Sequence, residues 1–248
     1  MKISDFIKLL IPYRIKFTIK NKLKIFFYCK ETYSQCGEDI IISSIFESKN
    51  IKNISYIDIG ANHPYYISNT AKFYTSSNAK TCILIEPNAR LANELKRARP
   101  NDTVLNIGIS PYDKREILKF YVMNADVLST FSEKEVEAYI KMGYWLVETL
   151  EIPCRGINEV LDEYYQKSEL NLLSIDVEGL DYDIIASINF NSVRPNVICV
   201  ETVNYREPEF VKRDDRIIDF LTSKNYHVYA QNFLNTIFVD KNYLSKVV

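Results

Sequence analysis

Glycine is scarce in this chain: only six of its 248 residues are glycine. Collagen-like chains, glycine linkers and glycine-rich phosphate-binding loops need more of it, so these architectures are excluded. Neither the P-loop pattern G-x-x-x-x-G-K-S/T nor the nucleophile pattern G-x-S-x-G occurs in the sequence. P-loop nucleotide-binding domains and α/β-hydrolases are therefore excluded as well.

Long apolar runs and an excess of charge of either sign are also missing. The 31 basic and 32 acidic residues leave a formal charge of −1, which supplies no field for nucleic acid. No stretch approaches the ~20 apolar residues that span a bilayer. Lys8 and Arg14 interrupt the first apolar run, which is too short for a signal peptide. We expect a cytoplasmic protein without a nucleic-acid partner.

The five cysteines are odd in number and include no C-x-x-C pair. Cys82 and Cys199 lie inside apolar runs that are typical of strands. A zinc site would need clustered ligands, and disulfides would need an oxidising compartment. We therefore expect buried free thiols in a reducing compartment.

The first thirty residues differ from the rest of the chain, because they carry eight basic residues against a single acid, Asp5. Apolar residues recur among them at helical spacing, namely Phe6, Leu9, Leu10, Tyr13 and Phe17. We predict a basic helical arm over residues 1–32 and one domain over residues 33–248. The arm packs on its own domain or on the second subunit of a homodimer, or it contacts an anionic membrane or a polyanionic substrate.

Strands and helices alternate along the domain. We expect helices at residues 39–47, 69–76, 91–98, 133–142, 158–165, 181–188 and 214–223, and strands at residues 56–60, 81–85, 103–109, 116–122, 170–177, 196–200, 227–230 and 236–240. Continuous apolar strands that alternate with helices predict an α/β fold, with a mostly parallel sheet and helices on both faces. The last two strands are close in sequence and predict an antiparallel hairpin at one edge.

Acidic side chains stand at the carboxyl ends of the predicted strands, where parallel sheets bind their ligands. The first strand ends in the turn D-I-G-A-N at residues 58–62. Its single glycine lets the backbone approach a ligand, but the absence of a full G-x-G-x-x-G argues against a dinucleotide. Glu86 ends the second strand, where a carboxylate accepts hydrogen bonds from two ribose hydroxyls. The alternative role of Glu86 is to cap the helix that begins near Asn88.

Asp176 and Glu178 follow the fourth strand, and a glycine ends that strand, so both carboxylates can turn toward a pocket. Asp176 is a candidate general base for a hydroxyl, and Glu178 is a second candidate for a catalytic residue. Asp176 is also a candidate ligand of Mg²⁺ or Mn²⁺, shared with Glu201 on the next strand. The alternative is a helix-capping network with Asp181 and Asp183.

His63 is a further candidate for the catalytic base, because it follows the first turn directly. An unperturbed imidazole titrates near neutral pH and suits proton abstraction there. The alternative is a structural histidine in a loop. His227 lies on a predicted strand, and we interpret it as structural.

Five short motifs follow one another along the domain. They are Y-S-Q-C-G-E-D at residues 33–39, D-I-G-A-N-H-P at 58–64, S-N-T at 68–70, I-E-P-N at 85–88 and L-S-I-D-V-E-G at 173–179. In this order they resemble the motifs of the FkbM-type S-adenosylmethionine-dependent methyltransferases. Asn106 and the S-T-F-S stretch at residues 129–132 fit the same pattern. The resemblance extends from about residue 33 to residue 240 and leaves out the basic arm.

The resemblance implies a class I methyltransferase fold, which is a Rossmann-like sheet of seven strands with an antiparallel edge strand. It also implies S-adenosylmethionine as the cofactor. By this resemblance the cofactor-binding residues are Gln35 and Glu38 on the N-terminal side, Asp58, Gly60, Ala61 and Asn62 by the methionine part, Glu86 and Pro87 by the ribose, and Asn106 and Gly108 by the adenine. Family members generally methylate hydroxyl groups.

The leading interpretation is an O-methyltransferase that acts on the hydroxyl of a nucleotide-linked or polysaccharide-linked sugar in surface polysaccharide biosynthesis. Tyr144, Trp145, Tyr205 and Arg206 are candidates for the acceptor pocket, because aromatic faces stack on sugar rings and arginine pairs with diphosphates. Ordinary packing is the alternative for the aromatic residues. Three other functions stay open: a nucleotide-sugar glycosyltransferase, a methyltransferase of a non-sugar secondary metabolite, and a degenerate domain that serves as an interaction module.

Overall fold

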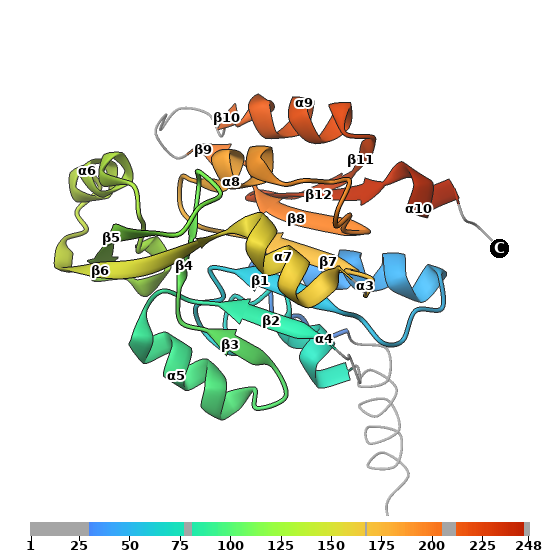
Figure 1. The fold of residues 1–248 in the computed structure, drawn as a ribbon, viewed down its shortest axis with the longest axis horizontal. Helices are drawn as coiled ribbons and strands as arrows, with labels where there is room; N and C mark the ends of the chain where they lie inside the picture. The colour runs from blue at the N-terminus through green and yellow to red at the C-terminus, as the bar shows by residue number, and fades with distance from the viewer. Residues whose placement is uncertain (1–29, 77–80, 167, 205–211, 246–248) are drawn as a thin grey trace, which may run out of the picture. The chain divides into compact units, whose positions relative to one another are not determined.

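The structure, a computed structural model, describes residues 30–76, 81–166, 168–204 and 212–245. The predicted basic arm lies outside the described residues, apart from its last three positions, and so do the acceptor candidates Tyr205 and Arg206. From Thr32 onward the chain forms one unit, which is built around a seven-stranded sheet (Figure 1).

The sheet has the strand order β11-β12-β8-β7-β1-β2-β3. Its strands are β1 (Tyr56–Ile59), β2 (Cys82–Ile85), β3 (Thr103–Leu105), β7 (Leu172–Ile175), β8 (Val197–Glu201), β11 (Tyr226–Gln231) and β12 (Asn235–Asp240). The five strands from β8 to β3 pair parallel to one another, and β12 pairs antiparallel with both β8 and β11. The prediction of a mostly parallel α/β sheet with a C-terminal hairpin at one edge is confirmed.

The antiparallel strand lies second from the edge of the sheet, not at the edge itself. Every residue of β12 is buried, whereas buried and exposed positions mix along β11. The central residues 237–239 of β12 are apolar and pack on both faces of the sheet, so they gain most from a place between two neighbours, whereas the half-polar β11 tolerates the edge. The burial pattern therefore explains why β12 inserts between β8 and β11.

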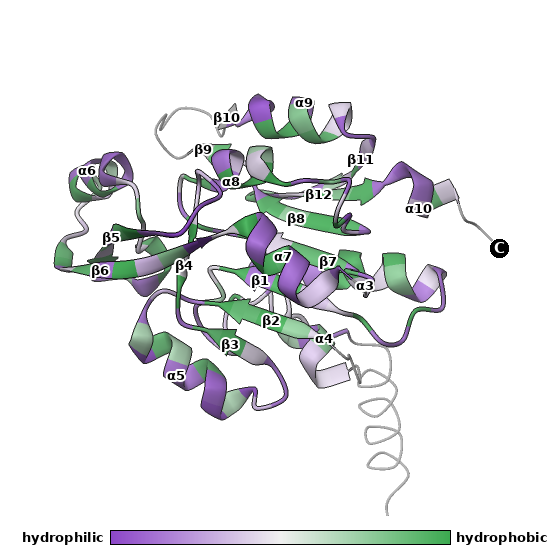
Figure 2. Ribbon diagram, viewed as in Figure 1, coloured by the Kyte–Doolittle hydropathy of each residue, from purple (hydrophilic) through white to green (hydrophobic). Residues whose placement is uncertain are grey.

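Helices cover both faces of the sheet, as predicted. One face carries α7 (Ile157–Tyr165), α8 (Asp181–Ser187) and α9 (Asp215–Ser223), and the other carries α3 (Glu38–Ser48), α4 (Ala71–Ser76), α5 (Ala89–Ala98) and α10 (Lys241–Ser245). The side chains of each strand alternate between two apolar clusters, so that Ile57 and Ile59 pack on the first face and Tyr56 on the second. Figure 2 shows the strands as largely hydrophobic between helices that carry hydrophilic residues.

A second, three-stranded sheet of order β4-β6-β5 was not expected. It consists of β4 (Gly108–Ser110), β6 (Leu146–Gly156) and β5 (Glu116–Met123). The strand predicted at residues 103–109 is divided between β3 in the large sheet and β4 in the small one. No strand was predicted over β6, because its first residues are exposed and Pro153 interrupts the pattern. The short helix η1 (Asp126–Leu128) and α6 (Glu133–Lys141) belong to the same region.

The remaining elements are short. β9 (Val203–Asn204) and β10 (Lys212–Arg213) pair antiparallel beside the start of α9. Among the described cysteines, Cys82, Cys154 and Cys199 are buried free thiols, as expected, but Cys36 is exposed. None of the described helices combines the length and the apolar character that crossing a membrane requires.

Candidate active site

The carboxyl ends of the central strands meet in one row. Ile59 of β1 pairs with Ile85 of β2 and with Ile175 of β7, and Ile175 pairs with Val200 of β8. The residues one position further along the chain are therefore neighbours at this edge: Gly60, Glu86, Asp176 and Glu201. The chain proceeds from β1 to β2 on one side, while β7 lies on the other side of β1. A reversal of this kind is where such sheets bind ligands.

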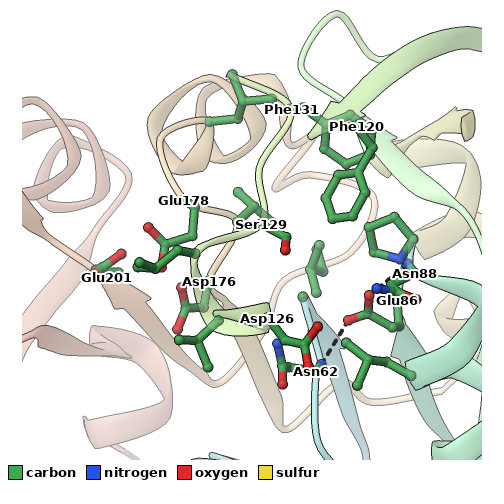
Figure 3. Close-up of a pocket in the computed structure, with 18 of the residues that line it drawn as sticks. Asn62, Glu86, Asn88, Phe120, Asp126, Ser129, Phe131, Asp176, Glu178 and Glu201 are labelled. Carbon is green, nitrogen blue, oxygen red and sulfur yellow. Dashed lines mark hydrogen bonds between the residues drawn. The ribbon is translucent and has the colours of Figure 1, made fainter. Parts of the chain in front are cut away.

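A cavity of about 350 Å³ opens beside this row (Figure 3). The row itself forms one wall, and the small sheet with the segment before α6 forms another. Six of the predicted cofactor-binding residues line the cavity: Gln35, Gly60, Asn62, Glu86, Pro87 and Gly108. The other four, Glu38, Asp58, Ala61 and Asn106, are not among the lining residues. A cavity of this size holds a small molecule or cofactor.

Glu86 is held rigidly at the cavity wall. The backbone N–H of Asn62 donates to its Oε2 over 2.9 Å, and that of Asn88 donates to its Oε1 over 2.8 Å. Burial raises the pKa of Glu86 to about 7, although these two hydrogen bonds favour the charged form. Asn88 also caps α5 through its own side chain. Both expected roles of Glu86 are therefore compatible, since each oxygen keeps a lone pair for a ligand hydroxyl.

Gly60 lines the cavity and also makes room for a neighbouring turn of the protein. Its φ is +82°, and a Cβ at this position would lie 1.9 Å from the carbonyl oxygen of Asp176. Glycine is therefore required by the close approach of two turns of the protein. Gly108 makes room in a similar way, because a Cβ there would lie 2.5 Å from the ring of Phe131, which lines the cavity.

Asp58 belongs to a buried network behind the cavity wall. Its Oδ2 accepts a hydrogen bond of 2.7 Å from the hydroxyl of Thr70, which also accepts from the guanidinium of Arg99. Arg99 is fully buried and forms an ion pair with Asp102. Burial raises the pKa of Asp58. Asp58 therefore links β1 to the residue just before α4.

Asn106 and Glu38 also support the wall without lining it. The amide of Asn106 donates to the carbonyl oxygens of Glu86 and Pro87, which fixes the turn after β2. Glu38 is buried and accepts from the amides of Asn232 and Asn235, each over 2.7 Å. Ala61 is buried in the apolar cluster below the turn. Asn106, Glu38 and Ala61 therefore affect the shape of the cavity through the residues that they contact.

Three carboxylate side chains lie close together on the cavity wall opposite Glu86 (Figure 3). One oxygen each of Asp176, Glu178 and Glu201 lies within 4.8 Å of the others. We call these three residues the acid cluster. The predicted pair of Asp176 and Glu201 is thus brought together, with Glu178 as a third member. Burial, together with the charges of Asp181, Asp58 and Glu38, raises the pKa of Asp176 to about 7.

Glu178 is held by hydrogen bonds both at its side chain and at its backbone carbonyl. The hydroxyl of Tyr139 on α6 donates to its Oε2, and the hydroxyl of Thr130 donates to its carbonyl oxygen over 2.7 Å. Its φ is +54°, which is unfavourable for a residue with a side chain. Burial and the charge of Asp176 raise its pKa, against the hydrogen bond from Tyr139. A strained backbone held by two external donors is typical of a functional turn.

His63 does not line the cavity. Its Nδ1 accepts hydrogen bonds from the backbone N–H groups of Tyr65, over 3.1 Å, and Tyr66, over 2.8 Å. The nitrogen is thus engaged in shaping the loop after β1. The structure agrees with the structural alternative for His63 and gives its imidazole no place beside the acid cluster.

Several lining residues were not foreseen. They include Asp126, Ser129 and Phe131 before α6, Tyr139 on α6 and Asn235 at the start of β12. Tyr144 lines the cavity as expected, whereas Trp145 is 61% exposed and does not. The only sequence signal for this wall was the S-T-F-S stretch at residues 129–132. Tyr139 and Asn235 carry no local signal, because their role depends on contacts with residues far away in the chain.

A sheet of this strand order, with an antiparallel β12 and a carboxylate after β2 that faces a cavity beside β1, defines a class I S-adenosylmethionine-dependent methyltransferase. The family model of the methyltransferase FkbM domain matches residues 58–228. This chain belongs to that family, and its cofactor is S-adenosylmethionine. No curated protein matches the chain.

Two solved structures are similar in fold. An O-methyltransferase from Bacillus cereus, in complex with S-adenosylhomocysteine, is 13% identical, with 94% of each chain covered and a TM-score of 0.46. A TehB-like S-adenosylmethionine-dependent methyltransferase from Corynebacterium glutamicum is 8% identical, and the match covers 91% of this chain and 97% of that one at a TM-score of 0.43.

Proposed function

We propose that this chain transfers a methyl group to the hydroxyl of a nucleotide-linked or polysaccharide-linked sugar in surface polysaccharide biosynthesis. The observation that carries the proposal is the acid cluster, which faces Glu86 across the cavity. Glu86 suits the ribose end of the cofactor, and the acid cluster suits an acceptor that must lose a proton. One cavity therefore contains residues suited to binding the cofactor and residues suited to deprotonating the acceptor.

The residues present fit S-adenosylmethionine. Glu86 holds two backbone N–H groups and keeps one lone pair on each oxygen for the two ribose hydroxyls. Ile107, Ile109 and Phe131 supply apolar lining that suits the adenine ring. When bound, the cofactor supplies a methyl group on a positively charged sulfur. The carboxylates that line the cavity favour that charge.

A sugar hydroxyl is a poor nucleophile until its proton is removed. The acid cluster provides the acceptor for this proton, since the pKa of Asp176 is raised to about 7 and three close carboxylates attract a proton strongly. The alcohol oxygen would then take the methyl group as the bond between that carbon and the cofactor's sulfur breaks, which leaves S-adenosylhomocysteine as a neutral thioether, and the proton stays on a carboxylate. Alignment of the oxygen by the rigid turn at Glu178 contributes to the rate.

A polyhydroxylated acceptor suits the lining of this cavity. Tyr66, Tyr139 and Tyr144 line the cavity, which suits a sugar because sugar rings pack on aromatic side chains, and the carboxylates accept hydrogen bonds from further hydroxyls. These features support a sugar over an apolar acceptor. The cytoplasmic location and the homodimer or membrane contact through the basic arm stay predictions of the sequence.

The proposal is tested in two stages. Calorimetric titration of the full chain with S-adenosylhomocysteine tests the cofactor, and micromolar affinity is expected. Incubation with labelled S-adenosylmethionine and panels of nucleotide sugars, cell-surface polysaccharides and small aromatic metabolites then tests the acceptor. A methyl ether on a sugar, identified by mass spectrometry, supports the proposal. Labelling of a non-sugar metabolite alone, or binding of UDP or GDP without S-adenosylhomocysteine, contradicts it.

A further inference from the structure

We propose that the acid cluster and the side-chain amide oxygen of Asn235 form a binding site for one divalent cation, Mg²⁺ or Mn²⁺. The site is defined by geometry alone, whereas its role in methyl transfer rests on the proposed function. The four side chains come from three neighbouring segments: the turn after β7, the end of β8 and the start of β12. All four residues line the same cavity.

The oxygens of the acid cluster have the spread that one cation needs. Ligands at roughly 2.1 Å from Mg²⁺ lie about 3 Å apart when adjacent and about 4.2 Å apart when opposite in an octahedron. The three carboxylate oxygens lie within 4.8 Å of one another. A small contraction of this spread brings the three oxygens within ligand distance of one cation.

The electrostatics of the acid cluster favour a cation. Three carboxylates at this distance repel one another strongly in a half-buried site. Within the described ranges, Asp176 and Glu178 form no ion pair with a lysine or arginine, and their one hydrogen bond from a side chain comes from the neutral hydroxyl of Tyr139. A divalent cation neutralises the charge of Asp176 and Glu178 more completely than that hydroxyl does.

The buried side-chain amide of Asn235 also supports a bound cation. Its Nδ2 donates to Oε1 of Glu38 over 2.7 Å, which fixes the orientation of the amide, because a carboxylate cannot donate to the amide oxygen. Its Oδ1 is buried and has no hydrogen-bond partner among the described residues, and the residue as a whole is 5% exposed. A buried acceptor without a partner is rare in folded proteins. A cation satisfies this oxygen.

The register of the sheet directs this amide toward the acid cluster. Asn235 of β12 pairs directly with Glu201 of β8 in the antiparallel ladder. Side chains that are directly opposite in such a pair project from the same face, with Cβ atoms about 5 Å apart. The amide oxygen of Asn235 therefore extends the acid cluster by a fourth oxygen donor.

The donor set selects the class of metal. Three carboxylates and one amide are hard oxygen ligands, which suit Mg²⁺ and Mn²⁺, whereas zinc sites are built mainly from cysteine and histidine. Four protein donors leave two positions of an octahedron for water or for the acceptor hydroxyl. A hydroxyl bound there has a lower pKa, and its proton passes to a carboxylate oxygen that is not bound to the cation.

Titration of the metal-free full chain with Mn²⁺, followed by the electron paramagnetic resonance of the free ion, tests the site without any acceptor. One Mn²⁺ per chain is expected, displaced by excess Mg²⁺. Asp176→Asn and Glu201→Gln should each weaken Mn²⁺ binding by about tenfold or more. Asp219→Asn, an exposed carboxylate on α9, is the matched control and should leave the affinity unchanged.

Titration of every variant with S-adenosylhomocysteine in the presence of EDTA verifies the fold and separates the two proposals. If S-adenosylhomocysteine binds and Mn²⁺ does not, the methyltransferase function stands and the cation site is overturned. If Mn²⁺ binds with the expected losses and S-adenosylhomocysteine does not, the cation site stands and the proposed function fails. Equal Mn²⁺ binding by the wild type and both cluster variants also overturns the site.

Discussion

The backbone N–H of Asn62 donates to Oε2 of Glu86 over 2.9 Å and so joins the turn after β1 to the end of β2. Asn62 has a φ of +48°, a conformation that asparagine tolerates better than most residues. The hydrogen bond fixes one oxygen of Glu86, and the N–H of Asn88 fixes the other. A carboxylate held in this way presents its remaining lone pairs to the cavity in one orientation.

Replacement of Glu86 by alanine should weaken the binding of S-adenosylhomocysteine by ~1–3 kcal/mol, because two charge-assisted hydrogen bonds are lost. Calorimetric titration measures the change. Glu137→Ala, on the exposed side of α6, is the control and should leave the affinity as in the wild type. Unchanged affinity in Glu86→Ala would show that the ribose is bound elsewhere.

Cofactor affinity and stability should depend on pH in opposite directions through Glu86. Burial raises its pKa from 4.5 to about 7, so the folded chain keeps a proton that the unfolded chain releases. The contribution of Glu86 to the free energy of unfolding is therefore full below pH 4.5 and is lost as the pH rises through about 7. The affinity for S-adenosylhomocysteine should rise over the same window, because the ionised carboxylate accepts hydrogen bonds from both ribose hydroxyls.

Urea unfolding and calorimetric titration at several pH values check both trends. Glu86→Gln cannot titrate at this position, so its difference from the wild type isolates the contribution of Glu86. The expectation is wrong if the wild type and Glu86→Gln show the same pH dependence in both measurements.

Gly60→Ala should destabilise the fold much more than Gly143→Ala. Both glycines have a positive φ, of +82° and +95°, but a Cβ at Gly60 meets the carbonyl oxygen of Asp176 and one at Gly143 meets nothing within 4 Å. The left-handed conformation alone costs alanine about 1–2 kcal/mol. The clash at Gly60 should bring its loss to ~3 kcal/mol or more. Equal losses in urea unfolding would contradict the close approach of the two turns.

Asp176→Asn should abolish most of the methyl transfer and leave the affinity for S-adenosylhomocysteine largely intact. The amide keeps the size of the side chain but neither accepts the proton of the acceptor hydroxyl nor neutralises a cation. Initial rates with an identified acceptor, together with calorimetry, measure the two effects separately. Full activity of the variant would remove Asp176 from the reaction.

Tyr139→Phe tests whether the hydrogen bond from the Tyr139 hydroxyl holds the side chain of Glu178 in place. Loss of the hydroxyl that donates to Oε2 should lower kcat by roughly tenfold, with little change in cofactor affinity. Tyr229→Phe, on the exposed edge strand β11, is the control. A rate equal to that of the wild type would mean that Glu178 keeps its position through Thr130 and its own backbone alone.

The sequence allowed most of the large sheet to be predicted, because its strands are short runs of isoleucine, leucine and valine between helices. It also located Glu86, Asp176 and Glu201 at strand ends. The small sheet escaped prediction, since Pro153 and the exposed residues of β6 break the strand pattern. Glu38, which the resemblance places by the cofactor, accepts hydrogen bonds from Asn232 and Asn235 and is not among the lining residues, an arrangement that depends on residues far away in the chain.

Periodicity and residue type by themselves determined the fold class and the carboxylates that end the strands, since these depend on local preference and on which faces must be buried. The family followed from the resemblance of five ordered motifs. The tertiary structure alone decided that Asp176, Glu178 and Glu201 converge within 4.8 Å. It also decided that Tyr139 reaches Glu178 and that Asn235 lies opposite Glu201. The physical reason is that register and side-chain direction result from packing between segments far apart in the chain, which no local pattern encodes.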